Sequence, residues 1–353
     1  MSGLSGIVRK TERTQRDNPK HTYMKRYLII GFSILSLNNS FCQKGMLQFR
    51  QEGEFKIVQF TDMHLQNSVS ESVFELVKNI VDVEKPDLVV ITGDICVQDT
   101  VDDLLLRLAN RFAEKKIHWV SVFGNHDGEN GPPRKTLSAI YRSLPYNLNS
   151  TTSGIKGETN FILPVAGKKG KHQALLYFFD SNAYNPLKDR VKGTYGWIDF
   201  SQIHWYRDQS AAFTKKNKGV PVPSLAFFHI PLPEYQMLWE EDSASCIGTK
   251  HEEVFCPMIN SGLYASMLEC GDIMGTFVGH DHVNDYIGIR DGIALAYGRF
   301  SGAKNTYGHL TPGARVIVLK EGKREFDTWI RERGGNILYS TQIHFNKEQV
   351  IKN

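Results

Sequence analysis

Short apolar runs alternate with longer amphipathic stretches in the first half of the chain. Runs at residues 55–60, 88–92 and 118–123 are typical of buried parallel strands, and each stops at polar residues. Between them, residues 70–84 and 101–115 place their apolar side chains at helical spacing along one face. This order of strand, helix, strand, helix and strand predicts a parallel sheet with right-handed crossovers.

The later pattern is less regular but still alternates between the two kinds of element. We predict helices over 134–143, 201–216 and 262–270, strands over 175–179, 225–228, 276–278, 315–320 and 324–330, and a hairpin over 284–297 that turns at Asp291-Gly292. The late strands indicate a second sheet. We therefore predict one α/β domain over residues 50–345, with two packed mixed β-sheets flanked by helices.

Residues of metal-binding type follow the ends of the predicted strands. Asp62, Asp94 and Asn125 come just after the first three strands and are spaced by 32 and 31 residues. A strand–helix–strand unit takes about 30 residues, so this spacing puts all three side chains at the carboxyl edge of one sheet. Further candidates stand at similar places: His64, His229, His280 and His282. Carboxylate, amide and imidazole groups at one edge predict a two-metal hydrolase site.

Aromatic side chains also fall in predicted loops beyond the strand ends: Tyr184, Tyr195, Trp197, Tyr235 and Trp239. They could line a substrate cleft. We favour the interpretation that they are partly buried loop aromatics.

The charge of the chain is concentrated at its start. The 353 residues carry a net charge of +4, but residues 1–42 alone contribute +5, which leaves −1 for the remainder. A globular part with a net charge near zero does not predict nucleic-acid binding.

The basic residues precede a short apolar run at 27–37, which is typical of a secretory signal peptide. We predict a signal peptide over residues 1–42, with Met24 as a possible true start, and an exported protein that is periplasmic or secreted. The alternative is an uncleaved N-terminal segment that anchors the protein to a membrane.

The cysteines give no separate metal site. Removal of Cys42 with the signal would leave Cys96, Cys246, Cys256 and Cys270, and no C-x-x-C motif occurs. In an oxidising compartment Cys246 and Cys256 could pair across a loop, although four cysteines allow three pairings and the sequence does not choose among them.

The polar residues at the strand ends form five motifs in a fixed order. They are Asp62-Met63-His64, Gly93-Asp94, Gly124-Asn125-His126-Asp127, His229 and Gly279-His280-Asp281-His282. This set resembles the pattern of the calcineurin-like metallophosphoesterases, and the similarity covers about residues 55–300. Segments 226–235 and 277–285 look most similar to a non-purple branch that holds plant proteins labelled "probable inactive purple acid phosphatase" and related fungal phosphatases.

The resemblance implies a role for each motif residue. One metal ion would be held by Asp62, His64, Asp94 and His282, and the other by Asp94, Asn125, His229 and His280, so that Asp94 bridges both. His126 would contact the phosphoryl group or protonate the leaving oxygen. Asp127 would orient His126, as a carboxylate fixes a histidine tautomer.

The resemblance also implies a reaction, the hydrolysis of a phosphate ester by direct attack of a metal-bridging hydroxide. The nitrogen and oxygen ligands suit Mn, Fe or Zn alike. Val97 stands where the purple enzymes carry a tyrosine, so we expect no purple colour.

We predict a phosphomonoesterase that acts on a phosphorylated small molecule or phosphoprotein. One alternative is a phosphodiesterase acting on nucleotides or phospholipid headgroups, and another is a catalytically silent binding scaffold. The sequence leaves the natural substrate, the metal pair and the oligomeric state open.

Overall fold

The computed structural model describes residues 46–67, 69–97, 101–303 and 308–345. The predicted signal peptide at 1–42 lies outside the described residues, and so does the alternative of an N-terminal anchor. Among the described residues, no helix combines the length and apolar character needed to cross a membrane.

The first sheet has six strands in the order β12-β11-β10-β1-β2-β3. Its bounds are β1 (Glu54–Phe60), β2 (Leu88–Thr92), β3 (His118–Val122), β10 (Gly313–Lys320), β11 (Glu325–Glu332) and β12 (Ile337–His344). Strands β1, β2 and β3 are parallel, as their buried apolar runs predict, whereas β10 joins β1 antiparallel. This parallel part brings three strand ends to one edge.

The second sheet has the order β4-β5-β6-β7-β9-β8. Its bounds are β4 (Phe161–Ala166), β5 (His172–Phe178), β6 (Ser224–Phe227), β7 (Ile273–Val278), β8 (Ile287–Arg290) and β9 (Ile293–Tyr297). Strands β5, β6, β7 and β9 are parallel, while β4 and β8 form antiparallel edges. The predicted class of two mixed β-sheets flanked by helices is therefore confirmed. The prediction that the late strands form the second sheet is wrong, because β10 and β11 extend the first sheet through the pairing of β10 with β1.

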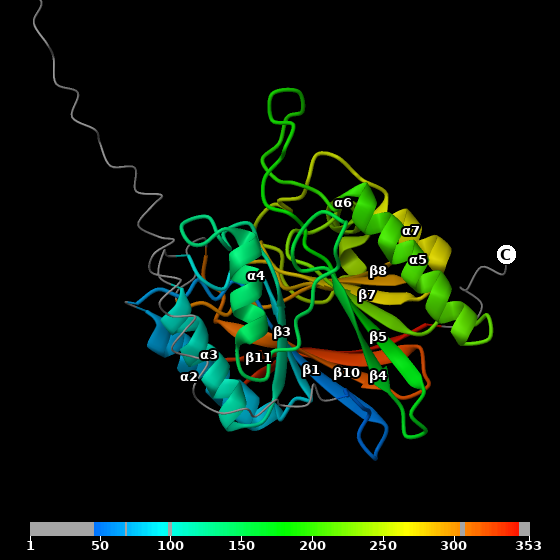
Figure 1. Ribbon diagram of the computed structural model, residues 1–353, viewed down its shortest axis with the longest axis horizontal. Coiled ribbons are helices and arrows are strands. Elements are labelled where there is room, and N and C mark those ends of the chain that lie inside the picture. The colour runs from blue at the N-terminus through cyan, green and yellow to red at the C-terminus, as the bar shows by residue number, and fades with distance from the viewer. Residues whose placement is uncertain (1–45, 68, 98–100, 304–307, 346–353) are drawn as a thin grey trace, which may run out of the picture. The chain divides into compact units, whose positions relative to one another are not determined.

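Helices cover the outer faces of the two sheets (Figure 1). Their bounds are α2 (Ser70–Glu84), α3 (Asp102–Glu114), α4 (Arg134–Ser143), α5 (Phe200–Lys216), α6 (Pro233–Asp242) and α7 (Leu263–Cys270), and a short 3-10 turn, η2 (Ser243–Ser245), follows α6. Helices α2, α3 and α4 share an apolar core with the first sheet, and α5, α6 and α7 share one with the second. A third core lies between the sheets and takes side chains from both.

Two strands and one α-helix were not predicted from the sequence. Strand β4 contains Pro164, which suits an edge strand but interrupts the strand pattern. Strand β12 is mostly exposed and so lacks an apolar run. Helix α6 begins at Pro233 and carries Tyr235 and Trp239, so the prediction that these two aromatics lie in a loop is wrong.

Candidate metal centre

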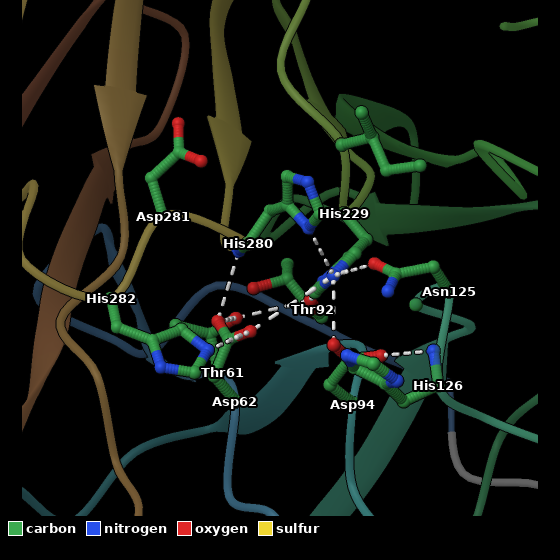
Figure 2. A network of polar contacts seen from close by, with 12 residues as sticks. Thr61, Asp62, Thr92, Asp94, Asn125, His126, His229, His280, Asp281 and His282 are labelled. Atoms are coloured by element: carbon green, nitrogen blue, oxygen red, sulfur yellow. Dashed lines mark hydrogen bonds and ion pairs between the residues drawn. The ribbon is translucent and has the colours of Figure 1, made fainter. Parts of the chain in front are cut away.

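The residues that follow the parallel strands of both sheets converge on one place (Figure 2). Ligand atoms of Asp62, His64 and His282 lie within 4.8 Å of one another. Those of Asp94, His229 and His280 form a second group and also lie within 4.8 Å of one another. The Oδ1 atom of Asn125 lies 3.2 Å from Nε2 of His229 and so adjoins the second group. The structure thus brings together all seven residues predicted as ligands.

Asp94 stands between the two groups. Its Oδ2 atom lies 3.6 Å from Nε2 of His64 in the first group and 3.2 Å from Nε2 of His229 in the second. Its other oxygen, Oδ1, accepts a hydrogen bond of 2.9 Å from the backbone N–H of His126. Because this bond fixes the carboxylate, a single oxygen faces both groups.

Hydrogen bonds behind the centre aim the other ligands inward. The Oδ2 atom of Asp62 accepts from the hydroxyl of Thr61 at 2.6 Å and from the backbone N–H of His280 at 3.0 Å, which leaves Oδ1 facing the centre. His229 Nδ1 lies 2.7 Å from the carbonyl oxygen of Thr92. A carbonyl only accepts, so Nδ1 carries a proton and Nε2 is the nitrogen that faces the centre.

The backbone at the strand ends is held in an unusual conformation. Asp62, His64, Asp94 and His280 have φ values of 52°, 46°, 51° and 78°, in the left-handed region that side-chain-bearing residues rarely adopt. Such residues persist only where the surrounding structure enforces them, and they concentrate at functional sites. Here the turn redirects each side chain from the strand towards the centre.

The motif glycines make the close approach of these turns possible. A Cβ atom at Gly124 would lie 2.1 Å from Oδ1 of Asp94, and one at Gly279 would lie 1.9 Å from the hydroxyl oxygen of Thr61. Both distances are far below van der Waals contact, so a larger residue would displace a ligand or its supporting group.

The charges of the centre strongly shift the pKa values of its residues. Burial alone would raise the pKa of Asp62, but the facing His229 and His282 outweigh burial and hold this pKa at about 2. Burial likewise opposes the charged form of His229, but Asp94 and Asp62 raise its pKa to about 10. Burial and the charge of His229 together lower the pKa of His280 to about 3. Two ionised carboxylates therefore create a strong demand for positive charge.

The donor set fits metal ions. The inward Oδ1 atom of Asp62 and Nε2 atom of His64 are buried and find no hydrogen-bond partner among the described residues, a costly arrangement unless a cation binds them. Mixed carboxylate, amide and imidazole donors suit Mn, Fe or Zn.

The structure corrects the role expected for Asp127. Its buried carboxylate accepts hydrogen bonds from the backbone N–H groups of Asp94, Gly124 and Ile95, at 2.8, 2.8 and 3.0 Å. Burial and the nearby charge of Asp94 raise the pKa of Asp127 to about 6. Asp127 thus fixes the loops that carry the ligands, and the carboxylate at the imidazole of His126 belongs to Glu129.

Four further residues at the centre were not assigned to it from the sequence. They are Thr61, Glu129, Tyr184 and Tyr195. Tyr195 places its ring edge-on to His280, with ring centroids 4.3 Å apart, so the interpretation of Tyr195 as only a loop aromatic is too narrow. The four described cysteines are free thiols, so the possible pairing of Cys246 with Cys256 is not observed.

The chain matches the calcineurin-like phosphoesterase family over residues 55–284, a span that contains all five motifs of the centre. Because this match covers more than half of the chain, the protein belongs to the calcineurin-like phosphoesterase family.

Similarity to individual proteins supports this assignment. The chain is 33% identical to "Probable inactive purple acid phosphatase 28" of Arabidopsis thaliana, over 80% of this chain and 79% of the relative. It is 33% identical to "Phosphatase DCR2" of Saccharomyces cerevisiae, over 82% of this chain but only 55% of that longer protein. The crystal structure of a dimetal phosphatase from Danio rerio shares the fold, with a TM-score of 0.57 and 12% identity over 83% of this chain and 99% of the other.

Proposed function

We propose that this protein is a metal-dependent phosphomonoesterase. The observation that carries the proposal is the placement of Asp94 Oδ2 between two groups of ligand atoms, 3.6 Å from His64 and 3.2 Å from His229. A two-metal phosphoesterase needs such a shared oxygen, because its ions lie only about 3.5–4 Å apart.

The two ions would be held by the residues of each group. Asp62, His64 and His282 with Asp94 would hold one, and His229, His280 and Asn125 with Asp94 would hold the other. When bound, the pair supplies Lewis-acid chemistry that activates water and neutralises charge on the phosphoryl oxygens.

The chain's own residues then position the substrate and move a proton. His126 stands at the edge of the centre, with its ring centroid 5.6 Å from that of His64, and is partly exposed. In this role it donates a proton to the leaving oxygen as the bond between phosphorus and that oxygen breaks. Water attacks phosphorus directly, so no covalent phosphoenzyme forms.

The label "inactive" on plant relatives makes a silent scaffold the main competing hypothesis. The ligand set of this chain does not support a catalytically silent scaffold, because each of the seven predicted ligands is present and contributes to the centre. Export from the cell and a phosphorylated small molecule or phosphoprotein as substrate stay predictions.

Asp94→Ala tests the proposal directly. Reconstitution with Mn, Zn or Fe should give wild-type protein about two bound ions and turnover of p-nitrophenyl phosphate in preference to bis-(p-nitrophenyl) phosphate. Loss of the shared carboxylate should reduce metal content and lower kcat by at least about a hundred-fold.

The matched control is Asp208→Ala, an exposed aspartate on α5. This variant should keep the metal content and activity of the wild type. Equal, negligible turnover in the reconstituted wild type and in Asp94→Ala would favour the scaffold, whereas preference for the diester would identify a phosphodiesterase.

A further inference from the structure

A tight turn places Glu129 beside His126. The backbone N–H of Glu129 donates to the carbonyl of His126 at 3.1 Å, and Gly128 inside the turn has a φ of 87°. Glycine adopts this conformation without strain. The two side chains therefore lie on the same side of the turn, with 2.5 Å between Nδ1 of His126 and Oε2 of Glu129.

The second oxygen of Glu129 is held from a distant part of the chain. The hydroxyl of Tyr184 donates to Oε1 of Glu129 at 2.9 Å. Tyr184 pairs with Tyr195 through an isolated antiparallel bridge, and the ring of Tyr195 lies against His280. The long loop between β5 and α5 (Figure 1) thus contacts both the metal centre and the support of His126.

Other carboxylates near the centre do not provide this support. Both oxygens of Asp127 accept backbone N–H groups, and Asp94 and Asp62 accept backbone N–H groups while facing the ligand histidines. Among the described residues, the carboxylate that contacts the imidazole of His126 is that of Glu129.

We propose that Glu129 and Tyr184 are positioning residues that fix the tautomer and orientation of His126. This inference rests on the proposed phosphomonoesterase function. A carboxylate accepts only, so Nδ1 of His126 carries a proton and donates it to Glu129, and Nε2 is the nitrogen that faces the leaving oxygen. Tyr184 in turn holds Glu129 in the orientation that this bond requires.

The proton balance of the step is simple. In its acid form His126 is an imidazolium with a proton on each ring nitrogen. As the bond from phosphorus to the leaving oxygen breaks, that oxygen takes the proton of Nε2 and departs as an alcohol, which leaves the neutral ring with its proton on Nδ1. The oxygen of the attacking water forms the new bond to phosphorus, and a proton from this water restores Nε2. Glu129 keeps its hydrogen bond throughout and is not consumed.

Leaving-group dependence tests the inference in the metal-loaded enzyme. Proton donation matters most for a poor leaving group, so Glu129→Ala should lower kcat for glycerol 2-phosphate by about 10–100-fold while kcat for p-nitrophenyl phosphate falls by less than about three-fold. KM, metal content and thermal stability should stay close to wild type. Glu129→Gln, which keeps an acceptor oxygen, should restore part of kcat, and Tyr184→Phe should show a smaller loss of the same kind.

Two substitutions away from the centre are matched controls. Glu269→Gln removes a surface carboxylate that pairs with Arg207, and Tyr264→Phe removes a hydroxyl that donates to the carbonyl of Arg290 at 2.7 Å. Both should leave the ratio of the two kcat values unchanged.

A second readout does not depend on turnover. In metal-free protein labelled with ¹⁵N-histidine, the ring signals of His126, assigned by their loss in His126→Gln, should show a proton on Nδ1. Glu129→Ala should shift these signals towards the other tautomer.

Three results would overturn the inference. They are an unchanged His126 tautomer in Glu129→Ala, an equal loss of kcat on both substrates, and a change in KM alone, which would make Glu129 and Tyr184 a substrate-binding surface. If His126→Ala shows the leaving-group dependence and Glu129→Ala does not, the positioning role fails while the proposed function stands. If the wild type hydrolyses neither substrate, the proposed function fails, and the tautomer still decides whether Glu129 holds His126.

Discussion

At the scale of single residues, the centre depends on which atom of each side chain faces inward. Thr61 occupies the outer oxygen of Asp62, and the carbonyl of Thr92 occupies the outer nitrogen of His229. These supports are themselves buried, so the inward atoms have little freedom to turn away. The groups that orient ligands are therefore as much a part of the site as the ligands.

One consequence at this scale is a pH-dependent stability of the metal-free protein. The carboxylates of Asp94 and Asp62 raise the pKa of His229 to about 10 despite burial, whereas a free histidine has a pKa of about 6.5. The stabilisation from charged His229 is complete below about pH 6.5 and is lost as the pH rises towards about 10. Urea unfolding of EDTA-treated protein should therefore show the free energy of unfolding falling over this range, by at most about 1.4 kcal/mol per pH unit for this group.

Two variants separate His229 from other titrating groups. His229→Gln should flatten the dependence, whereas His204→Gln, at an exposed position on α5, should retain it. The explanation fails if the wild type is equally stable across the range or if His229→Gln retains the slope.

At the scale of elements, the site is built from strand ends rather than from whole strands. Parallel strands from two sheets deliver their carboxyl ends to one place. After β1, β2 and β7 a residue in the left-handed region turns its side chain inward. The motif glycines let neighbouring turns pack closely enough for ligands from different strands to meet.

Gly124→Ala should disrupt this packing. Its Cβ would lie 2.1 Å from Oδ1 of Asp94, so the shared carboxylate must move. We expect metal affinity to fall by about 10–100-fold and stability to fall by about 1–3 kcal/mol. Calorimetric metal titration and urea unfolding measure the two effects. Gly334→Ala, whose Cβ meets no atom closer than 4.0 Å, should leave both unchanged, and wild-type metal affinity in Gly124→Ala would contradict the packing argument.

At the scale of the described domain, the core between the sheets fixes the positions of the two halves of the site relative to each other. This core takes Ile57 from β1 and Val90 from β2 in one sheet, and Phe227 from β6 and Phe277 from β7 in the other. The first two strands lead to Asp62 and Asp94, and the last two lead to His229 and His280. Packing between the sheets therefore sets the distance between the two groups of ligands.

Phe227→Ala should weaken both stability and metal binding. The side chain is fully buried between the sheets, so its loss should lower the free energy of unfolding by about 3–5 kcal/mol. Phe200→Ala, at an exposed position on α5, should change it by less than about 0.5 kcal/mol. Chemical denaturation with and without metal measures both, and a loss below 1 kcal/mol in Phe227→Ala would contradict the role of this core, taking about 1 kcal/mol as the average cost of a substitution.

The sequence contained most of the information for this arrangement. Buried parallel strands have continuous apolar runs, so β1, β2 and β3 and the helices between them could be predicted, and their spacing located Asp62, Asp94 and Asn125 at one edge. Edge strands such as β4 and β12 lack that signal, because they are partly exposed and, in β4, carry a proline.

The carboxylate that contacts His126 could not be predicted from the sequence in the same way. Asp127 is adjacent in sequence and has the expected chemistry, but the backbone turns its carboxylate towards buried N–H groups. The partner is Glu129, three residues along, and only the turn at Gly128 reveals it. The contribution of Tyr184 depends on a loop more than fifty residues away, for which the sequence has no local pattern.

The single inward oxygen of Asp94 has a final consequence for how the centre fills. Because one oxygen of Asp94 would hold both ions and also faces protonated His229, the affinities of the two positions would be linked to each other and to the protonation of His229. A different metal ion at one position would therefore alter the affinity of the other position for its own ion.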